Sequence, residues 1–254
     1  MPESENLPNK PLAEAILEVK WGEPNQRDPA YPIMVGRLYD EVREQYPATE
    51  ELPLAQFPPE LAVHIPRHRF RAAEGGWPLV QIGPGIVTLN DTENYRWPDF
   101  RQRALELHPA VTKTHPTPDA LDITSLKLQY IDAVSFDFEV ADVRAFLKTK
   151  LHIDVSIPGP LFEGQPVGDR PADARVQLTF PANLPSGRVQ LSVSTGRKND
   201  RPAVIWHTLL WSVGQDAKAG WRDFERWLDA AHGILDHWFF ALVQGDLLEE
   251  FRKQ

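Results

Sequence analysis

Hydrophobic and polar residues alternate along several short segments of the chain, which is the pattern of β-strands buried on one face. In 12–21, apolar residues alternate with glutamate and lysine over the length of a strand. Glycine and proline at 83–85 and at 185–187 mark tight turns, which predicts two β-hairpins. The other alternating or apolar segments are 61–65, 79–82, 86–89, 126–138, 176–180, 189–193 and 203–213.

Apolar residues spaced three or four positions apart predict helices between these strands. Helices are expected at 33–46, 98–108 and 143–151, and the first two would end at the prolines that follow them. A long final helix is expected from Asp216 to Leu242, because apolar residues step along one of its faces. These residues are Trp221, Phe224, Leu228, Ala231, Leu235, Trp238 and Leu242.

Both halves of the chain therefore have the predicted order strand, helix, three strands, helix. A connector rich in proline and threonine, 109–118, suggests a division into 1–115 and 116–254, or one compact two-lobed unit. Strands joined in threes by hairpins favour antiparallel sheets with helices packed on one face, since a parallel sheet would alternate helices and strands throughout. We expect an α+β fold with a duplicated architecture, for which the TATA-binding-protein-like fold is an analogy only.

The composition is that of a folded, acidic protein. Hydrophobic residues make up 42% of the 254 residues and aromatic residues 10%, which excludes wholesale disorder. The net charge of −9 disfavours binding of nucleic acid over the whole surface. The chain has no cysteine, which excludes disulfides, thiolate metal sites and cysteine nucleophiles. With no signal peptide or membrane span in the pattern, a cytoplasmic location without membrane contact is expected.

Motifs of known catalytic chemistry are missing from the sequence. It contains no Gly-x-Ser-x-Gly nucleophile elbow, no Gly-x-Gly-x-x-Gly and no P-loop. His232 and Asp236 lie one helical turn apart and could share an ion, but no third ligand can be named, and structural roles are favoured. We therefore assign no catalytic residue, no metal and no cofactor, and favour a protein that is not an enzyme.

The segment 64–71 is a basic cluster in an otherwise acidic chain. On a strand, Arg67, Arg69 and Arg71 would share one face and could grip carboxylates or phosphates. The alternative is an exposed strand end whose charge neighbouring acidic residues neutralise. Tyr95, Arg96 and Trp97 lead into a predicted helix and offer stacking and cation–π surfaces, or simply anchor the core.

Asp132 interrupts an apolar strand face, because the other even positions from 126 to 138 are all hydrophobic. A buried carboxylate is costly unless it is paired. Either a β-bulge near 131–133 turns Asp132 outward, or it faces the core and has a partner such as an arginine or histidine.

Three blocks resemble a sporadically distributed family of bacterial proteins of about this length, whose function is not characterised. They are 11–21, the hairpin from Val80 through Tyr95 with its following helix, and the strand around 128–132 with the aromatic-rich C-terminal helix. Where the family has an Asn–Arg pair, this chain has Asp132 and Ala133. The resemblance implies no activity, and the patchy distribution hints at accessory genes such as toxin–antitoxin or phage-defence cassettes.

The sequence thus favours a binding or adaptor module for a partner protein or a small anionic ligand. The expected contact residues are Arg67, Arg69, Arg71, Tyr95, Arg96 and Asp132. The alternative is a hydrolase with a site between the halves that uses Asp132 and a histidine. Self-association is also expected, because an antiparallel sheet covered on one face leaves a face or an edge to protect.

Overall fold

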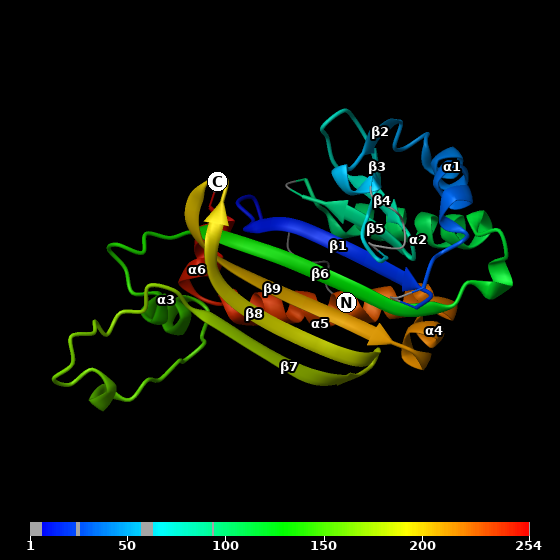
Figure 1. The fold of residues 1–254 in the computed structure, drawn as a ribbon. Coiled ribbons are helices and arrows are strands. Elements are labelled where there is room, and N and C mark those ends of the chain that lie inside the picture. Colours follow the sequence, from blue (N-terminus) through cyan, green and yellow to red (C-terminus); the bar gives the residue numbers. More distant parts are fainter. Residues whose placement is uncertain (1–6, 24–25, 57–62, 93, 254) are drawn as a thin grey trace.

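The computed structural model describes residues 7–23, 26–56, 63–92 and 94–253 (Figure 1). The first half contains β1 (Leu12–Trp21), α1 (Tyr31–Val42), β2 (Ala48–Glu51), β3 (His68–Arg71), β4 (Leu79–Gly83), β5 (Ile86–Asp91) and α2 (Trp97–Thr114). The second half contains β6 (Ile123–Ser135), α3 (Val143–Lys150), β7 (Arg175–Asn183), β8 (Ser186–Lys198), β9 (Arg201–Val213), α4 (Gln215–Arg222), α5 (Phe224–Val243) and α6 (Asp246–Arg252).

The strands form one continuous antiparallel sheet in the order β2-β3-β4-β5-β1-β6-β9-β8-β7. The first strands of the two halves, β1 and β6, pair at its centre. From there, each half adds its later strands outward in reverse order. The two halves therefore share one sheet, and the division near 115 does not separate two sheets.

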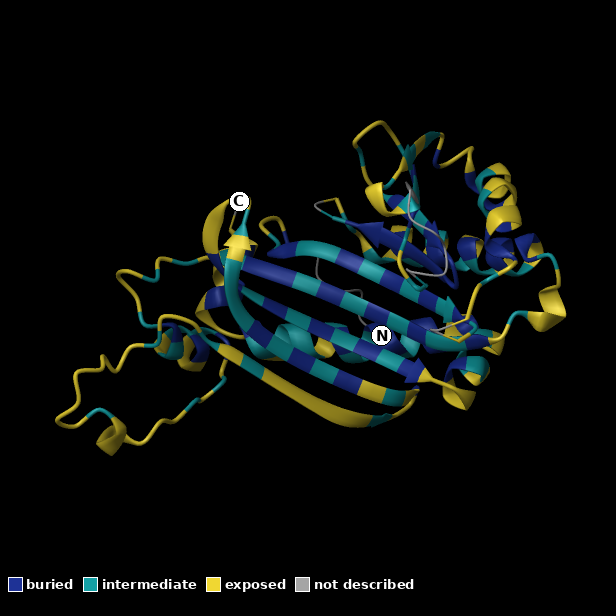
Figure 2. Cartoon of the chain, in the orientation of Figure 1, coloured by how far each residue is buried: buried dark blue, intermediate teal, exposed yellow. Residues whose placement is uncertain are grey.

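Side chains alternate between the two faces of the central strands, as the sequence pattern predicts. Leu17, Leu128 and Leu210 lie side by side on β1, β6 and β9 and are buried. Figure 2 shows this alternation of buried and less buried residues along β6 and β9. The α+β fold, with antiparallel strands and helices packed on one face, is confirmed.

The buried face supports two adjoining hydrophobic cores. The larger core joins the central sheet to α1, α2, α4 and most of α5, with Met34, Phe100 and Leu228 fully buried in it. The smaller core joins β8 and β9 to α3, α6 and the end of α5, around Trp206. Trp238 of α5 packs against both cores, so this helix connects them.

The predicted end of the helix at 98–108 was wrong, because α2 continues through Pro109 to Thr114. Ala110 and Val111 extend the buried face of α2 beyond the proline. Burial of this face offsets the backbone hydrogen bond that proline removes. Half of the expected connector is therefore helical.

Other boundaries also differ from the sequence pattern. The predicted final helix, 216–242, is two helices, α4 and α5, with a break at Asp223. A further helix that was not predicted, α6, follows Gly245, whose φ is 93°. The strand predicted at 61–65 falls partly outside the described residues, and 63–65 form a turn. A short strand, β2, was missed because its Ala-Thr-Glu-Glu sequence has no apolar alternation. Among the described residues, no helix is both long and apolar enough to cross a membrane.

Candidate functional site

A cavity of about 260 Å³ lies on the helical face of the sheet, where β6, the start of α2 and the second half of α5 meet. Ten of its fifteen lining residues are aromatic or aliphatic, and five are polar or charged. The aromatic walls are Tyr95, Trp97, Tyr130, Phe239 and Phe240. The polar and charged residues are Lys10, Arg96, Asp132, His232 and Asp236.

The local structure explains why these side chains converge. Tyr130 and Asp132 are two positions apart on β6, so both point to the helical face. His232 and Asp236 lie one turn apart on α5 and turn toward the same space. Arg96 has an extended backbone conformation before α2, and Pro98 occupies the first turn, as expected of a proline there.

A chain of hydrogen bonds crosses one wall of the cavity. The hydroxyl oxygens of Tyr95 and Tyr130 are 2.8 Å apart, and the Tyr130 hydroxyl is 2.9 Å from Nδ1 of His232. The indole of Trp97 stacks on the His232 ring, with centroids 3.6 Å apart and planes inclined by 14°. Burial lowers the pKa of His232 to about 4 and raises the pKa of both tyrosines, so this wall is uncharged at neutral pH.

Asp132 faces inward, with only 2% of its surface exposed. The pairing irregularity lies in β1, between Leu12 and Glu14, while β6 pairs regularly with β9 through Asp132. The prediction that a bulge turns Asp132 outward was therefore wrong, because the extra residue belongs to the neighbouring strand. Asp132 faces the core, which is the orientation that the other alternative predicted.

In the described part of the chain, Asp132 also lacks the expected arginine or histidine partner. Among the described residues, no hydrogen bond reaches its carboxylate. Lys198 supplies the nearest compensating charge, but its Nζ is bonded to the carbonyl oxygens of Pro11 and Ala133, at 3.3 and 3.4 Å. Burial raises the pKa of Asp132 to about 7, and the charge of Lys198 opposes this increase only in part.

The two basic residues of the cavity differ in their surroundings. Lys10 donates from Nζ to the carbonyl oxygen of Tyr95, at 2.5 Å, and burial lowers its pKa. Arg96 has 64% of its side chain exposed and a loose ion pair with Asp99, at 3.9 Å. Arg96 therefore lies where the cavity opens to solvent.

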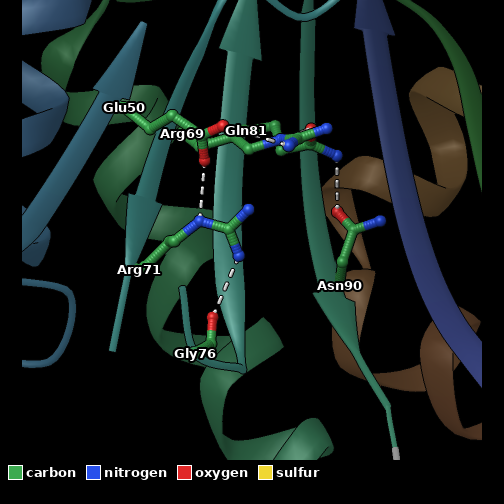
Figure 3. A network of polar contacts seen from close by, with 6 residues as sticks. All are labelled: Glu50, Arg69, Arg71, Gly76, Gln81 and Asn90. Carbon is green, nitrogen blue, oxygen red and sulfur yellow. Dashed lines mark hydrogen bonds and ion pairs between the residues drawn. The ribbon is translucent and has the colours of Figure 1, made fainter. Parts of the chain in front are cut away.

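Of the three arginines in the basic cluster (the arginine row: Arg67, Arg69 and Arg71), Arg69 and Arg71 of β3 lie on the face of the sheet opposite the helices (Figure 3). Nε of Arg71 donates to Glu50 at 2.8 Å and its Nη1 to the carbonyl of Gly76 at 3.0 Å. Arg69 donates to Gln81 at 2.7 Å and is also paired with Glu50. Arg67 is 1% exposed. The structure thus uses Arg69 and Arg71 to join β2, β3 and β4.

Three of the six expected contact residues, Tyr95, Arg96 and Asp132, meet in the cavity, although Asp132 is distant in sequence from the other two. The sequence analysis considered His232 and Asp236 but favoured structural roles for them, and it missed Lys10. The spacing of His232 and Asp236, one helical turn apart, could have indicated that both side chains line one site. In the part of the chain that the structure describes, no group of three or more potential metal ligands forms.

These features define an α+β protein with a small aromatic cavity beside its central strands. The sequence matches no protein-family model and no curated protein sequence. Among solved structures, the chain is similar to Methanococcus jannaschii TBP, with a TM-score of 0.26 and 10% identity over 87% of this chain and 99% of the other. At that TM-score and identity, the similarity carries no information on function.

Proposed function

We propose that this protein is a non-enzymatic binding module that holds a small, largely apolar molecule in the cavity between β6, α2 and α5. The observation that carries the proposal is the combination of aromatic walls with one buried carboxylate that has no hydrogen bond from the described residues. Small-molecule sites are typically apolar concavities with a few convergent polar groups of this kind. The expectation of an anionic ligand rested on the arginine row, in which Arg69 and Arg71 are ion-paired with Glu50.

The size of the cavity supports a small occupant. An apolar cavity of ~150 Å³ holds benzene. A volume of about 260 Å³ therefore leaves room for an aromatic ring with a short chain.

A location in the cytoplasm, in keeping with a chain that has no cysteine, is part of the proposal.

Filling the cavity tests this function. Leu12 of β1 lines the cavity, and Leu12→Trp should occupy much of its volume. Leu178→Trp on the edge strand β7 is the matched control, because Leu178 is 47% exposed and outside the cavity. Ligand-observed NMR with phenethylamine, propylbenzene and phenylpropionate should show binding to the wild type and to Leu178→Trp, and loss of binding in Leu12→Trp. Unchanged binding in folded Leu12→Trp would contradict the proposal, as would the absence of binding of all three probes to the wild type.

A hydrolase that uses Asp132 and His232 is the second candidate, because both residues line the same cavity. A carboxyl group with a pKa of about 7 is suited to act as a general base near neutral pH. However, no serine, threonine or cysteine is among the described residues that line the cavity, so water would have to attack the substrate directly. Turnover of small aryl esters with a rate that rises through pH 7, and its loss in Asp132→Asn, would favour this candidate over simple binding.

A further inference from the structure

We propose that the cavity selects a protonated amine, whose ammonium group pairs with Asp132 while its hydrocarbon part packs against the aromatic walls. This inference rests on the proposed function, because it assigns the chemical class of the occupant of the same cavity. It is argued from the unmet hydrogen-bonding capacity of Asp132, from the charges around the cavity and from the nature of its walls.

The carboxylate of Asp132 has unused capacity to accept hydrogen bonds. An ionised carboxylate offers about four acceptor positions, and a buried one is costly to leave unsatisfied. In the described part of the chain no donor bonds it, and Lys198 is engaged by two backbone carbonyls instead. Because Asp132 both lines the cavity and is 2% exposed, a molecule in the cavity is placed to supply the missing donors.

The cations that line the cavity are less available to a ligand than the carboxylate of Asp132. The lining holds two carboxyl groups, Asp132 and Asp236, and two basic groups, Lys10 and Arg96. Lys10 is already bonded to the carbonyl oxygen of Tyr95. Arg96 is largely in solvent, where water screens its charge. Within the described residues, the carboxylate of Asp132 accepts no hydrogen bond, so a ligand that donates to it is favoured over an anion.

The walls suit the remainder of such a ligand. Tyr95, Trp97 and Tyr130 line the same cavity as Asp132, and aromatic faces attract cations, most strongly where water is excluded. Phe239 and Phe240 add apolar surface from α5. A neutral hydrocarbon would fill the same volume but leave Asp132 unsatisfied, so the amine should bind more tightly.

Three probes of similar size separate these contributions: phenethylamine, propylbenzene and phenylpropionate. At pH 8, calorimetric titration of the whole chain should show phenethylamine binding at least about tenfold more tightly than the other two, since a charge-assisted hydrogen bond is worth ~1.5–3 kcal/mol. Asp132→Asn should abolish this preference while propylbenzene still binds. Asp91→Asn is the matched control, because it removes a buried carboxylate from β5 that does not line the cavity. It should preserve most of the preference.

Amine affinity should also rise with pH through about 7, as Asp132 becomes ionised. The titratable and charged groups around Asp132 are Lys198 on β8 and those that share the lining of the cavity: Lys10, Tyr95, Arg96, Tyr130, His232 and Asp236. His232, with a pKa of about 4, stays neutral over this range. The rise should be absent in Asp132→Asn.

Each alternative result has a defined meaning. Equal affinity for the amine and propylbenzene, with no effect of Asp132→Asn, would overturn the amine assignment and leave the cavity-binding function standing. Preference for phenylpropionate would overturn it as well. Binding that is unaffected by Leu12→Trp, or no binding of any probe, would overturn the proposed function itself.

Discussion

Relative to the wild type, Asp132→Asn should stabilise the protein more at high pH than at low pH. The carboxyl group is 2% exposed, and burial raises its pKa from 3.8 to about 7. Because the folded state binds this proton more tightly than the unfolded state, the contribution of Asp132 to stability is greatest below pH 4 and falls as the pH rises toward 7. Asparagine cannot ionise, so the variant lacks this loss.

The size of the effect follows from the two pKa values. Each tenfold difference in proton affinity is worth ~1.4 kcal/mol, so the whole loss amounts to about 4 kcal/mol above pH 7. About 2 kcal/mol of it has already occurred at pH 5, because the unfolded chain ionises first. Between pH 5 and pH 8, the advantage of the variant should therefore grow by about 2 to 3 kcal/mol.

Urea denaturation followed by tryptophan fluorescence at both pH values measures this difference directly. Effects of other titrating groups cancel when the variant is compared with the wild type at each pH. Asp119→Asn is the control, since it removes the same charge from an exposed position and should change stability by less than about 0.5 kcal/mol at either pH. A constant difference between Asp132→Asn and the wild type would refute the reasoning that an ionised carboxylate is buried without compensation.

Further predictions concern other parts of the molecule. Burial lowers the pKa of His232 from 6.5 to about 4, so the protein should lose stability as the pH decreases across that range. His232→Gln should reduce this loss by about 3 kcal/mol in acid titrations monitored by circular dichroism. An unchanged acid titration would contradict this prediction. Gly83→Ala should lower the melting temperature sharply, since a Cβ there would lie 2.0 Å from the carbonyl oxygen of Ile65, whereas Gly159→Ala, in open space, should have little effect. Glu50→Gln should cost no more than about 1 kcal/mol, and less at high salt, because its ion pairs are partly exposed; a larger cost in urea denaturation would mean that the Glu50 network is central to stability.

The elements that the sequence predicted well are those specified by short-range patterns. Alternation over 12–21 and 203–213 identified β1 and β9, and glycine–proline turns identified both hairpins. The end of α2 was missed because local rules stop a helix at Pro109. Packing of Ala110 and Val111 against the rest of the protein, which no local rule contains, extends it.

The candidate site was predictable only in pieces. Asp132 was a candidate because it interrupts a hydrophobic strand face, and the pattern left two orientations open, outward or toward the core. The choice between them depended on the extra residue in β1, a strand more than a hundred residues earlier in the chain. The arginine row was recognised as basic, but the pairing of β2 with β3, which brings Glu50 to it, was not.

The sequence by itself therefore determined most of the strands and helices, the face that the central strands bury and the α+β class, because these follow from side-chain periodicity within a few residues. Only the tertiary structure decided that β1 and β6 join the two halves into one sheet. It also decided that Asp132 lies in a cavity with His232 and Tyr95, and that Glu50 pairs with both Arg69 and Arg71. The physical reason is that burial, pairing and charge compensation depend on contacts between residues distant in the chain.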